Sequence, residues 1–222
     1  MSTLQEIAAP SRGRRRVTAL VSLAIVAAAS LWTVLERRAS TTRFRAGLVF
    51  TDDACALSPG VARTLGGPLS AADCAEVERI ARAEVTIAFE GLRLDLTTDP
   101  RAFWTVHVQA FIPSRTRTLG AAGASLAFGP LGGRGTVGVM PLVAHAMRHA
   151  PSGSSRPDLV TAIGLGVGRS AVHEFAHQIA GGAIDGTDPD TYEYGSVDRP
   201  SQYYGALHWG ATGERIRARL AR

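Results

Sequence analysis

Helical and strand-like spacings of apolar residues divide the chain into a series of elements. Residues 70–89 begin with a serine that suits a helix cap and carry apolar positions at helical spacing, which predicts a helix. Shorter alternating or continuous apolar stretches predict three strands, at residues 92–97, 103–112 and 135–140. Residues 141–150 predict one short helix.

A long helix dominates the second half of the pattern. Residues 156–180 keep helical character, with a proline and an aspartate in the first turn and two glycines after the last residue. The next stretch, residues 182–210, is rich in glycine, aspartate, tyrosine and proline and predicts an ordered loop region. Residues 210–222 predict a short basic helix. Together these elements predict an α+β domain with a small mixed sheet.

The first apolar segment is a different kind of element. Residues 17–35 contain no charged residue and are long enough to cross a bilayer as a helix. A basic stretch precedes them, and the alanines at 27–29 offer a signal-peptide cleavage site. We expect a signal anchor or a cleaved signal peptide, with the domain membrane-anchored or secreted and outside the cytoplasm. Residues 36–50 predict a charged linker, so we divide the chain into an N-terminal region, 1–46, and a domain, 47–222.

The positive charge of the chain lies mostly outside the domain. The formal net charge is +5, and all 24 basic residues are arginines. Residues 1–46 hold eight arginines and two glutamates, whereas residues 47–222 hold sixteen arginines and seventeen acidic residues. A nucleic-acid-binding domain would carry its charge as a patch on the domain itself. We therefore expect no nucleic-acid partner, and a membrane contact through residues 17–35.

Two cysteines, Cys55 and Cys74, lie near the start of the domain. Outside the cytoplasm they can form a disulfide that ties the first domain residues to the first helix. The alternative is two unpaired, buried thiols. Two cysteines this far apart are not a zinc knuckle, so the sequence assigns them no metal.

The long helix carries the pattern His-Glu-Phe-Ala-His at residues 173–177. His173 and His177 are four residues apart, so they lie one turn apart on one helix face and are able to bind the same ion. Glu174 stands beside the first histidine, where a carboxylate is able to take a proton from water and pass it on. The uncharged residues around them indicate a buried helix rather than a surface helix with two ordinary histidines. The pattern predicts a zinc site with Glu174 as general base.

A catalytic zinc needs a third protein ligand and an open fourth position. Downstream, residues 185–195 read Asp-Gly-Thr-Asp-Pro-Asp-Thr-Tyr-Glu-Tyr-Gly. Together with HExxH this segment resembles the aspzincin metallopeptidases, whose GTxDxxYG segment supplies an aspartate ligand. The family's ligand position falls on Pro189. The resemblance therefore points to the flanking Asp188, or else Asp190, as the third ligand, with Glu193 as a further candidate.

Polar and aromatic residues after the helix are candidates for supporting roles. The segment YEYGSVDRPSQYYGALHW, residues 192–209, is also similar to that of uncharacterised bacterial HExxH proteins. One of its side chains is expected to donate a hydrogen bond to an oxyanion, and we select His208 and Tyr192 from a group that also holds Tyr194, Tyr203 and Tyr204. The alternative for each tyrosine is packing beneath a loop. Asp185 or Asp198 is expected to orient a ligand histidine through its second ring nitrogen.

Two further patterns carry weaker expectations. His145 and His149 are also four residues apart, but no acid is near them in the sequence and Arg148 would repel a cation, so we expect a polar helix face. By analogy with zincins, the strand at 135–140 would be the sheet edge that pairs with an extended peptide.

These residues predict a zincin-like domain with an active-site helix behind one N-terminal membrane or signal segment. The expected activity is peptide-bond hydrolysis by a zinc-activated water, with Zn²⁺ as cofactor and a peptide or protein as substrate. One alternative is an exported zincin-like binding or structural module without activity. Another is a membrane-anchored assembly protein in which HEFAH is accidental and no zinc binds. The presence of Glu174 favours the enzyme, because a non-catalytic site has no need of a base.

Overall fold

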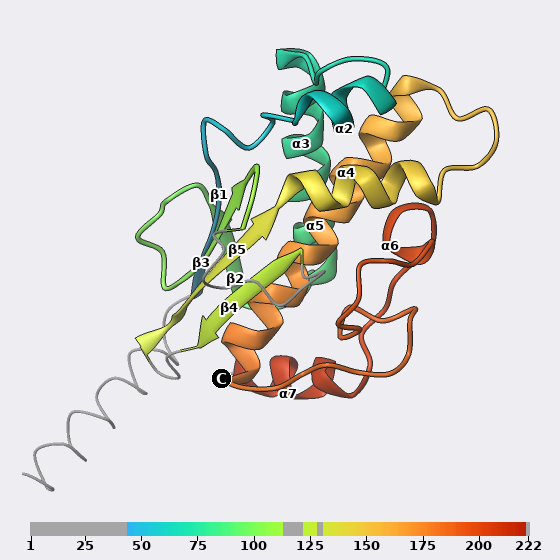
Figure 1. Cartoon of the computed structure of the whole chain (residues 1–222). Coiled ribbons are helices and arrows are strands. Elements are labelled where there is room, and N and C mark those ends of the chain that lie inside the picture. The colour runs from blue at the N-terminus through green and yellow to red at the C-terminus, as the bar shows by residue number, and fades with distance from the viewer. Residues whose placement is uncertain (1–43, 113–121, 128–130, 221–222) are drawn as a thin grey trace, which may run out of the picture. The chain divides into compact units, whose positions relative to one another are not determined.

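The structure is a computed structural model that describes residues 44–112, 122–127 and 131–220 (Figure 1). The predicted signal or anchor segment, residues 17–35, lies outside this part of the chain. Among the helices that the structure describes, none combines the length and the apolar character that a membrane span requires.

A five-stranded mixed sheet lies at the centre of the domain, in the order β2-β1-β3-β5-β4. Its strands are β1 (Phe44–Phe50), β2 (Leu94–Thr97), β3 (Trp104–Gln109), β4 (Gly123–Ala127) and β5 (Gly133–Gly138). The first four strands in spatial order pair in parallel, and β4 runs antiparallel to β5 at the edge. The α+β class and the small mixed sheet predicted from the sequence are confirmed.

Two strands are absent from the sequence prediction. β1 occupies residues where we expected a charged linker, so the folded part begins before residue 47. Its Ala46 and Leu48 are fully buried, because a central parallel strand is covered on both faces. The strand predicted at 135–140 is β5, and its expected place at the sheet edge is wrong. β5 lies inside the sheet, and the short strand β4 forms the edge instead.

Helices cover the sheet and supply the site. They are α2 (Pro59–Thr64), α3 (Ala71–Ala88), α4 (Val139–Arg148), α5 (Arg156–Ala180), α6 (Ser201–Tyr204) and α7 (Ala211–Leu220). The sequence predicts α3, α5 and α7 within a few residues, and α3 and α5 each start with a capping box, at Ser70 and Ser155. α5 ends at Gly181, whose φ of 75° is the left-handed conformation that glycine adopts without strain.

The long helix α5 packs against α3 and against strands β3, β4 and β5 (Figure 1). Gly164 and Gly168 lie one turn apart on α5 and face α3. A Cβ on Gly164 would stand 2.7 Å from the Cβ of Ile80, and one on Gly168 would stand 2.8 Å from the Cβ of Glu84. The two glycines therefore allow an approach between helices that larger side chains would block.

Cys55 and Cys74 form a disulfide bond. The bond joins the turn after β1 to the first turn of α3. The first of the two alternatives left by the sequence is confirmed. Because the link closes a loop between residues 19 positions apart, it removes conformations from the unfolded chain and so stabilises the fold.

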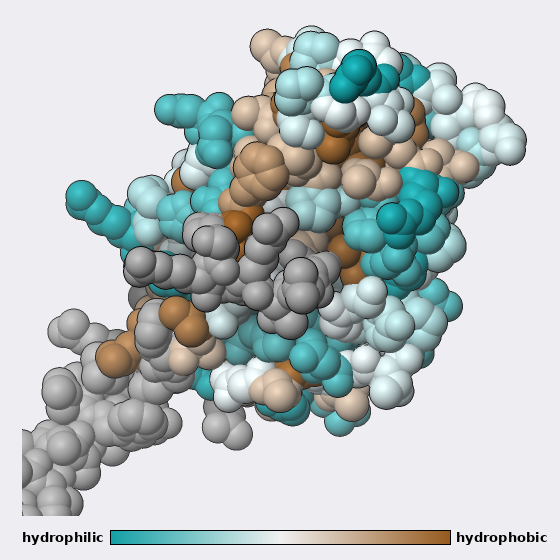
Figure 2. Space-filling model, in the orientation of Figure 1, coloured by the Kyte–Doolittle hydropathy of each residue, from teal (hydrophilic) through white to brown (hydrophobic). Residues whose placement is uncertain are grey.

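The exposed surface is mixed in character. In the view of Figure 2, brown hydrophobic residues occur in small groups between white residues of intermediate hydropathy and teal hydrophilic ones. Among the described residues, the large hydrophobic side chains that are exposed are Ile87, Phe111, Leu126 and Leu131. The buried apolar side chains form one core cluster, to which the sheet, α3, α4, α5 and α7 all contribute.

Candidate metal centre

The two histidines of the HEFAH pattern face each other on α5. Their ring centroids are 4.7 Å apart, and the Nε2 atoms of His173 and His177 are separated by 3.1 Å. This proximity follows from the helix, which places residues i and i+4 on the same face. The structure thus brings the two histidines together, and their role as metal ligands stays a prediction.

Asp185 brings a carboxylate to the same point. Its Oδ1 lies 3.3 Å from Nε2 of His173 and 3.7 Å from Nε2 of His177. Zinc–ligand distances of about 2.0–2.2 Å at tetrahedral angles would place neighbouring ligand atoms about 3.3–3.6 Å apart. The three measured separations, 3.1, 3.3 and 3.7 Å, fall around this range. The three side chains could therefore hold a metal ion between them.

Backbone carbonyls set the orientation of both imidazoles. Nδ1 of His173 lies 2.8 Å from the carbonyl oxygen of Tyr192, and Nδ1 of His177 lies 3.0 Å from that of Gly182. A carbonyl oxygen only accepts, so each Nδ1 carries the proton and each Nε2 presents a lone pair. Burial also holds the pKa of His173 below its usual value, which favours the neutral, metal-binding form. The Nε2 lone pairs of both histidines and the carboxylate of Asp185 face one another, an arrangement that a bound cation would stabilise.

The structure does not bring the predicted third ligands to the histidines. Asp188 accepts a hydrogen bond from the backbone N–H of Asp190 at 2.9 Å, and both side chains are exposed. Glu193 is buried and accepts from the backbone N–H groups of Gly210 and Thr212, at the start of α7. Neither of the two aspartates nor Glu193 belongs to the cluster around His173 and His177. Asp185, expected to orient a histidine, faces the ligand nitrogens directly.

A short bridge holds the Asp185 segment in place. The backbone N–H of Gly186 donates to the carbonyl oxygen of Glu193 at 2.8 Å, so the chain on either side of the turn is drawn together. A Cβ on Gly195 would lie 3.1 Å from Oδ1 of Asp185. The glycine therefore leaves room for the carboxylate beside the bridge.

Glu174 points into the site from a buried position. Its side chain is 4% exposed, and Oε2 has no hydrogen-bond partner among the described residues. Burial raises the pKa of Glu174 to about 7, and the negative charge of Asp185 adds to the effect. A carboxyl group with this pKa is able to accept and release a proton near neutral pH.

The edge strand β4 approaches Glu174 through a glycine. A Cβ on Gly123 would stand 2.8 Å from Cδ of Glu174. Next along the strand, the hydroxyl of Ser125 donates to the backbone carbonyl of Glu174 at 3.1 Å. Buried Gln178 adds a third link, because its Nε2 donates to Oγ of Ser125 at 3.2 Å. Small residues and an amide thus fix the distance between the sheet edge and α5.

The two residues selected as oxyanion donors lie elsewhere. The hydroxyl of Tyr192 donates to Oε1 of Glu84 at 3.0 Å, in a buried network where Arg169 also binds Glu84. His208 is exposed and pairs with the 190–192 segment only through its backbone. Of the tyrosines considered, Tyr194 is the one that lines the cleft at the metal centre. Tyr192 serves the site through its carbonyl oxygen rather than its hydroxyl.

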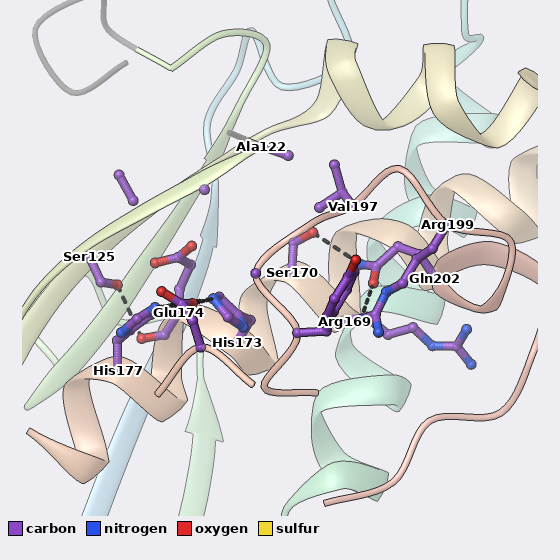
Figure 3. Close-up of a pocket in the computed structure, with 15 residues that line it drawn as sticks. Ala122, Ser125, Arg169, Ser170, His173, Glu174, His177, Val197, Arg199 and Gln202 are labelled. Atoms are coloured by element: carbon purple, nitrogen blue, oxygen red, sulfur yellow. Dashed lines mark hydrogen bonds and ion pairs between the residues drawn. The ribbon is translucent and has the colours of Figure 1, made fainter. Parts of the chain in front are cut away.

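The cluster opens into a cleft of about 370 Å³. Figure 3 shows His173, Glu174 and His177 at one end and Arg169, Ser170, Val197, Arg199 and Gln202 at the other. Arg199 is 5% exposed and donates to the carbonyl oxygens of Pro189 and Thr191. Burial lowers its pKa to about 10, so it stays a cation at neutral pH. The guanidinium group of Arg199 makes a cation–π contact with Tyr194, with its central carbon 5.0 Å from the ring centroid. This contact holds the tyrosine beside the cleft.

A second histidine pair departs from its prediction. His145 and His149, at the C-terminal end of α4, were expected to form a polar helix face with no acidic residue nearby. Asp198 approaches both rings from a distant part of the chain, so a second His/His/Asp cluster is present. No local pattern in the sequence indicates this contact, because His149 and Asp198 are 49 positions apart. Asp198 therefore does not orient a histidine of the first cluster.

In comparisons with known proteins, no protein-family model, no curated protein and no solved structure matches this chain. The resemblance to aspzincins rests on residues 173–195 alone.

Proposed function

We propose that the domain is a zinc-dependent peptidase of the zincin type. His173, His177 and Asp185 would hold the metal, and Glu174 would act as general base. The observation that carries this proposal is the approach of three atoms able to ligate a metal, to within 3.1–3.7 Å of one another, beside a buried glutamate oxygen that has no hydrogen-bond partner among the described residues. Structural ion pairs do not usually leave a buried carboxylate oxygen unsatisfied.

The metal and the protein would divide the chemistry between them. A bound zinc ion supplies a Lewis acid that polarises the peptide carbonyl and lowers the pKa of water. Glu174 accepts the proton of the attacking water and later delivers it to the leaving amine nitrogen. Tyr194, which lines the cleft, would donate a hydrogen bond to the carbonyl oxygen as it gains negative charge. The peptide would enter the cleft beside β4, which is the edge strand of the sheet in the described part of the chain.

The proposed ligand set modifies the resemblance to aspzincins. That family takes its ligand aspartate two residues after the Gly-Thr pair, a position filled here by Pro189. In this chain the aspartate that precedes Gly186 and Thr187 would take the role. The ligand types stay the same, two imidazoles and one carboxylate, which suits zinc.

The proposal is tested by measuring zinc content and peptide hydrolysis on the same samples. Full-length protein reloaded with zinc is incubated with a mixed peptide library, and cleavage is followed by mass spectrometry. Glu174→Gln should retain the zinc bound at His173 and His177 and lose at least about a hundredfold in turnover, since a general base contributes about 10²–10⁴-fold. Asp185→Ala should weaken zinc binding at this centre and abolish turnover together.

Matched controls are Asp188→Ala and Asp190→Ala, which remove neighbouring exposed carboxylates. Both should keep zinc and activity if Asp185 is the third ligand. A wild-type protein that binds zinc at His173 and His177 but cleaves no peptide would favour the non-catalytic module. A protein that binds no zinc there would refute the metal centre itself.

A further inference from the structure

The second His/His/Asp cluster lies at the C-terminal end of α4. Nδ1 of His145 is 3.1 Å from Oδ1 of Asp198, and Nε2 of His149 is 2.9 Å from the same oxygen. All three ligand atoms lie within 4.8 Å of one another. The cluster thus repeats the donor set of the first centre, with histidines at i and i+4 and a carboxylate from a loop.

The surroundings of this cluster favour a cation in two ways. The last turn of a helix leaves carbonyl oxygens without intrahelical partners and carries partial negative charge, which attracts positive ions. His145 lies in the last turn of α4, and His149 is its C-cap residue. The side chains of both histidines are 17% exposed, so they are partly shielded from water while the site remains reachable.

Arg148 does not block the cluster. Its NH1 group donates to Oδ2 of Asp198 at 2.7 Å, whereas both imidazoles face Oδ1. The arginine therefore anchors one oxygen of the carboxylate and leaves the other directed at the histidines. Hydrogen bonds of this kind to the free oxygen commonly orient carboxylates that ligate metals.

We propose that His145, His149 and Asp198 form a second metal site for a divalent transition ion of the zinc class. The site is distinct from the proposed catalytic centre, since it shares no residue with it. Two imidazoles and one carboxylate suit zinc, and water would complete the coordination. The observed separations of 2.9 and 3.1 Å need to open only by a few tenths of an ångström to admit an ion.

The second ion would act as a tie between α4 and the wall of the cleft. Asp198 lies between Val197 and Arg199, both of which line the cleft at the first centre. Arg199 in turn binds the carbonyl oxygens of Pro189 and Thr191. An ion on Asp198 would therefore hold this segment in position without taking part in the chemistry.

The test counts zinc ions bound per chain. Metal is removed from the full-length protein with a chelator, and the protein is then incubated with Zn²⁺ and separated from free metal by gel filtration. Elemental mass spectrometry measures the bound zinc. The wild type should hold two ions. The variant His145→Ala/His149→Ala and the variant His173→Ala/His177→Ala should each hold one. The first of these should keep the ion of the proposed catalytic centre, so the two sites fail independently.

Two further variants separate a metal site from a hydrogen-bonded cluster. Asp198→Asn retains hydrogen-bonding capacity but loses the charge, and it should weaken the second site at least about tenfold in competition titrations. Arg148→Ala removes the nearby cation and keeps all three ligands, so it should still bind two ions. A wild type with one ion, unaffected by His145→Ala/His149→Ala, would overturn the proposal and leave the three side chains as a hydrogen-bonded clasp.

Discussion

At the scale of single residues, the burial of Glu174 lowers the stability of the metal-free fold but gives its carboxyl group a pKa that suits proton transfer. Its carboxylate is buried, and one oxygen has no hydrogen-bond partner in the part of the chain that the structure describes. Such a group is costly in a metal-free protein, because the negative charge is removed from water without full compensation. The same environment raises the pKa of Glu174 to about 7, which suits proton transfer at neutral pH. We therefore expect Glu174, the proposed general base, to weaken the metal-free fold.

This conflict predicts how the stability of the metal-free protein depends on pH. The folded pKa of Glu174 is raised from 4.5 to about 7, so its effect on stability is most favourable below pH 4.5 and is lost as pH rises through 7. Each pKa unit corresponds to about 1.4 kcal/mol. In excess chelator, Glu174→Gln should raise the free energy of unfolding by up to about 3 kcal/mol at pH 8, measured by urea denaturation.

At pH 4 the same substitution should change the free energy of unfolding little, since the wild-type carboxyl is then protonated in both states. The exposed Glu90→Gln serves as the control and should show no such contrast between the two pH values. Equal effects of Glu174→Gln at pH 4 and pH 8 would contradict the burial argument.

The sequence predicts which candidate site residues share a helix, but not which loop residues come close to them. The common face of His173 and His177, with Glu174 beside them on α5, could be predicted because helix geometry alone fixes their spacing. Asp185 depends on the path of the chain after α5, which is set by hydrogen bonds such as Gly186 to Glu193. No local pattern distinguishes it from the other aspartates of the loop. The position of the Tyr192 hydroxyl could not be predicted for a similar reason. Its hydrogen-bond partner, Glu84, lies on α3, far away in the sequence.

At the scale of elements, the contact between α3 and α5 positions the ligand helix. Gly168 faces α3, where a Cβ would stand 2.8 Å from the Cβ of Glu84 and 2.9 Å from the carbonyl oxygen of Ala81. A backbone oxygen is not free to move aside, so the helices would have to separate. Although alanine favours helix, we expect Gly168→Ala to lower the free energy of unfolding by about 1–3 kcal/mol in thermal unfolding.

Gly60→Ala is the matched comparison, because that glycine lies in α2 and a Cβ there would meet nothing within 4 Å. This substitution should be neutral or stabilise by up to about 1 kcal/mol. If both variants behaved alike, close packing between α3 and α5 would not explain the glycine at 168.

Elements with strong local signals are the ones that the sequence predicts. α3 and α5 start with capping boxes, and α5 ends at a glycine. Local residues therefore determine where these helices begin and where α5 ends. β1 has no such signal, because Arg45 interrupts its apolar stretch and only the assembled sheet buries Leu48. β4 is a short strand of small residues whose role comes from pairing with β5. Its glycine matters only because α5 lies against it.

At the scale of the whole molecule, the loop between α5 and α7 is a folded part of the site. Arg199 binds carbonyl oxygens within the loop, Glu193 binds backbone N–H groups at the start of α7, and Asp198 binds the end of α4. Each contact ties the loop to itself or to a helix through a side chain. This satisfies its backbone without regular strands and presents Asp185 to the two histidines.

The N-terminal region stays a prediction. Residues 17–35 predict a signal or anchor that exports the domain. The disulfide between Cys55 and Cys74 belongs to the class of bonds that persist outside the cytoplasm. Export would thus place the proposed peptidase where peptide or protein substrates outside the cell membrane are met.

The most direct test of the metal centre is diffraction at the zinc absorption edge from crystals of the zinc-loaded full-length protein. We predict an anomalous peak about 2.0–2.2 Å from Nε2 of His173, Nε2 of His177 and a carboxylate oxygen of Asp185. A zinc ion ligated by Asp188 or Asp190 in place of Asp185 would contradict this account, and so would the absence of an anomalous peak between the two histidines.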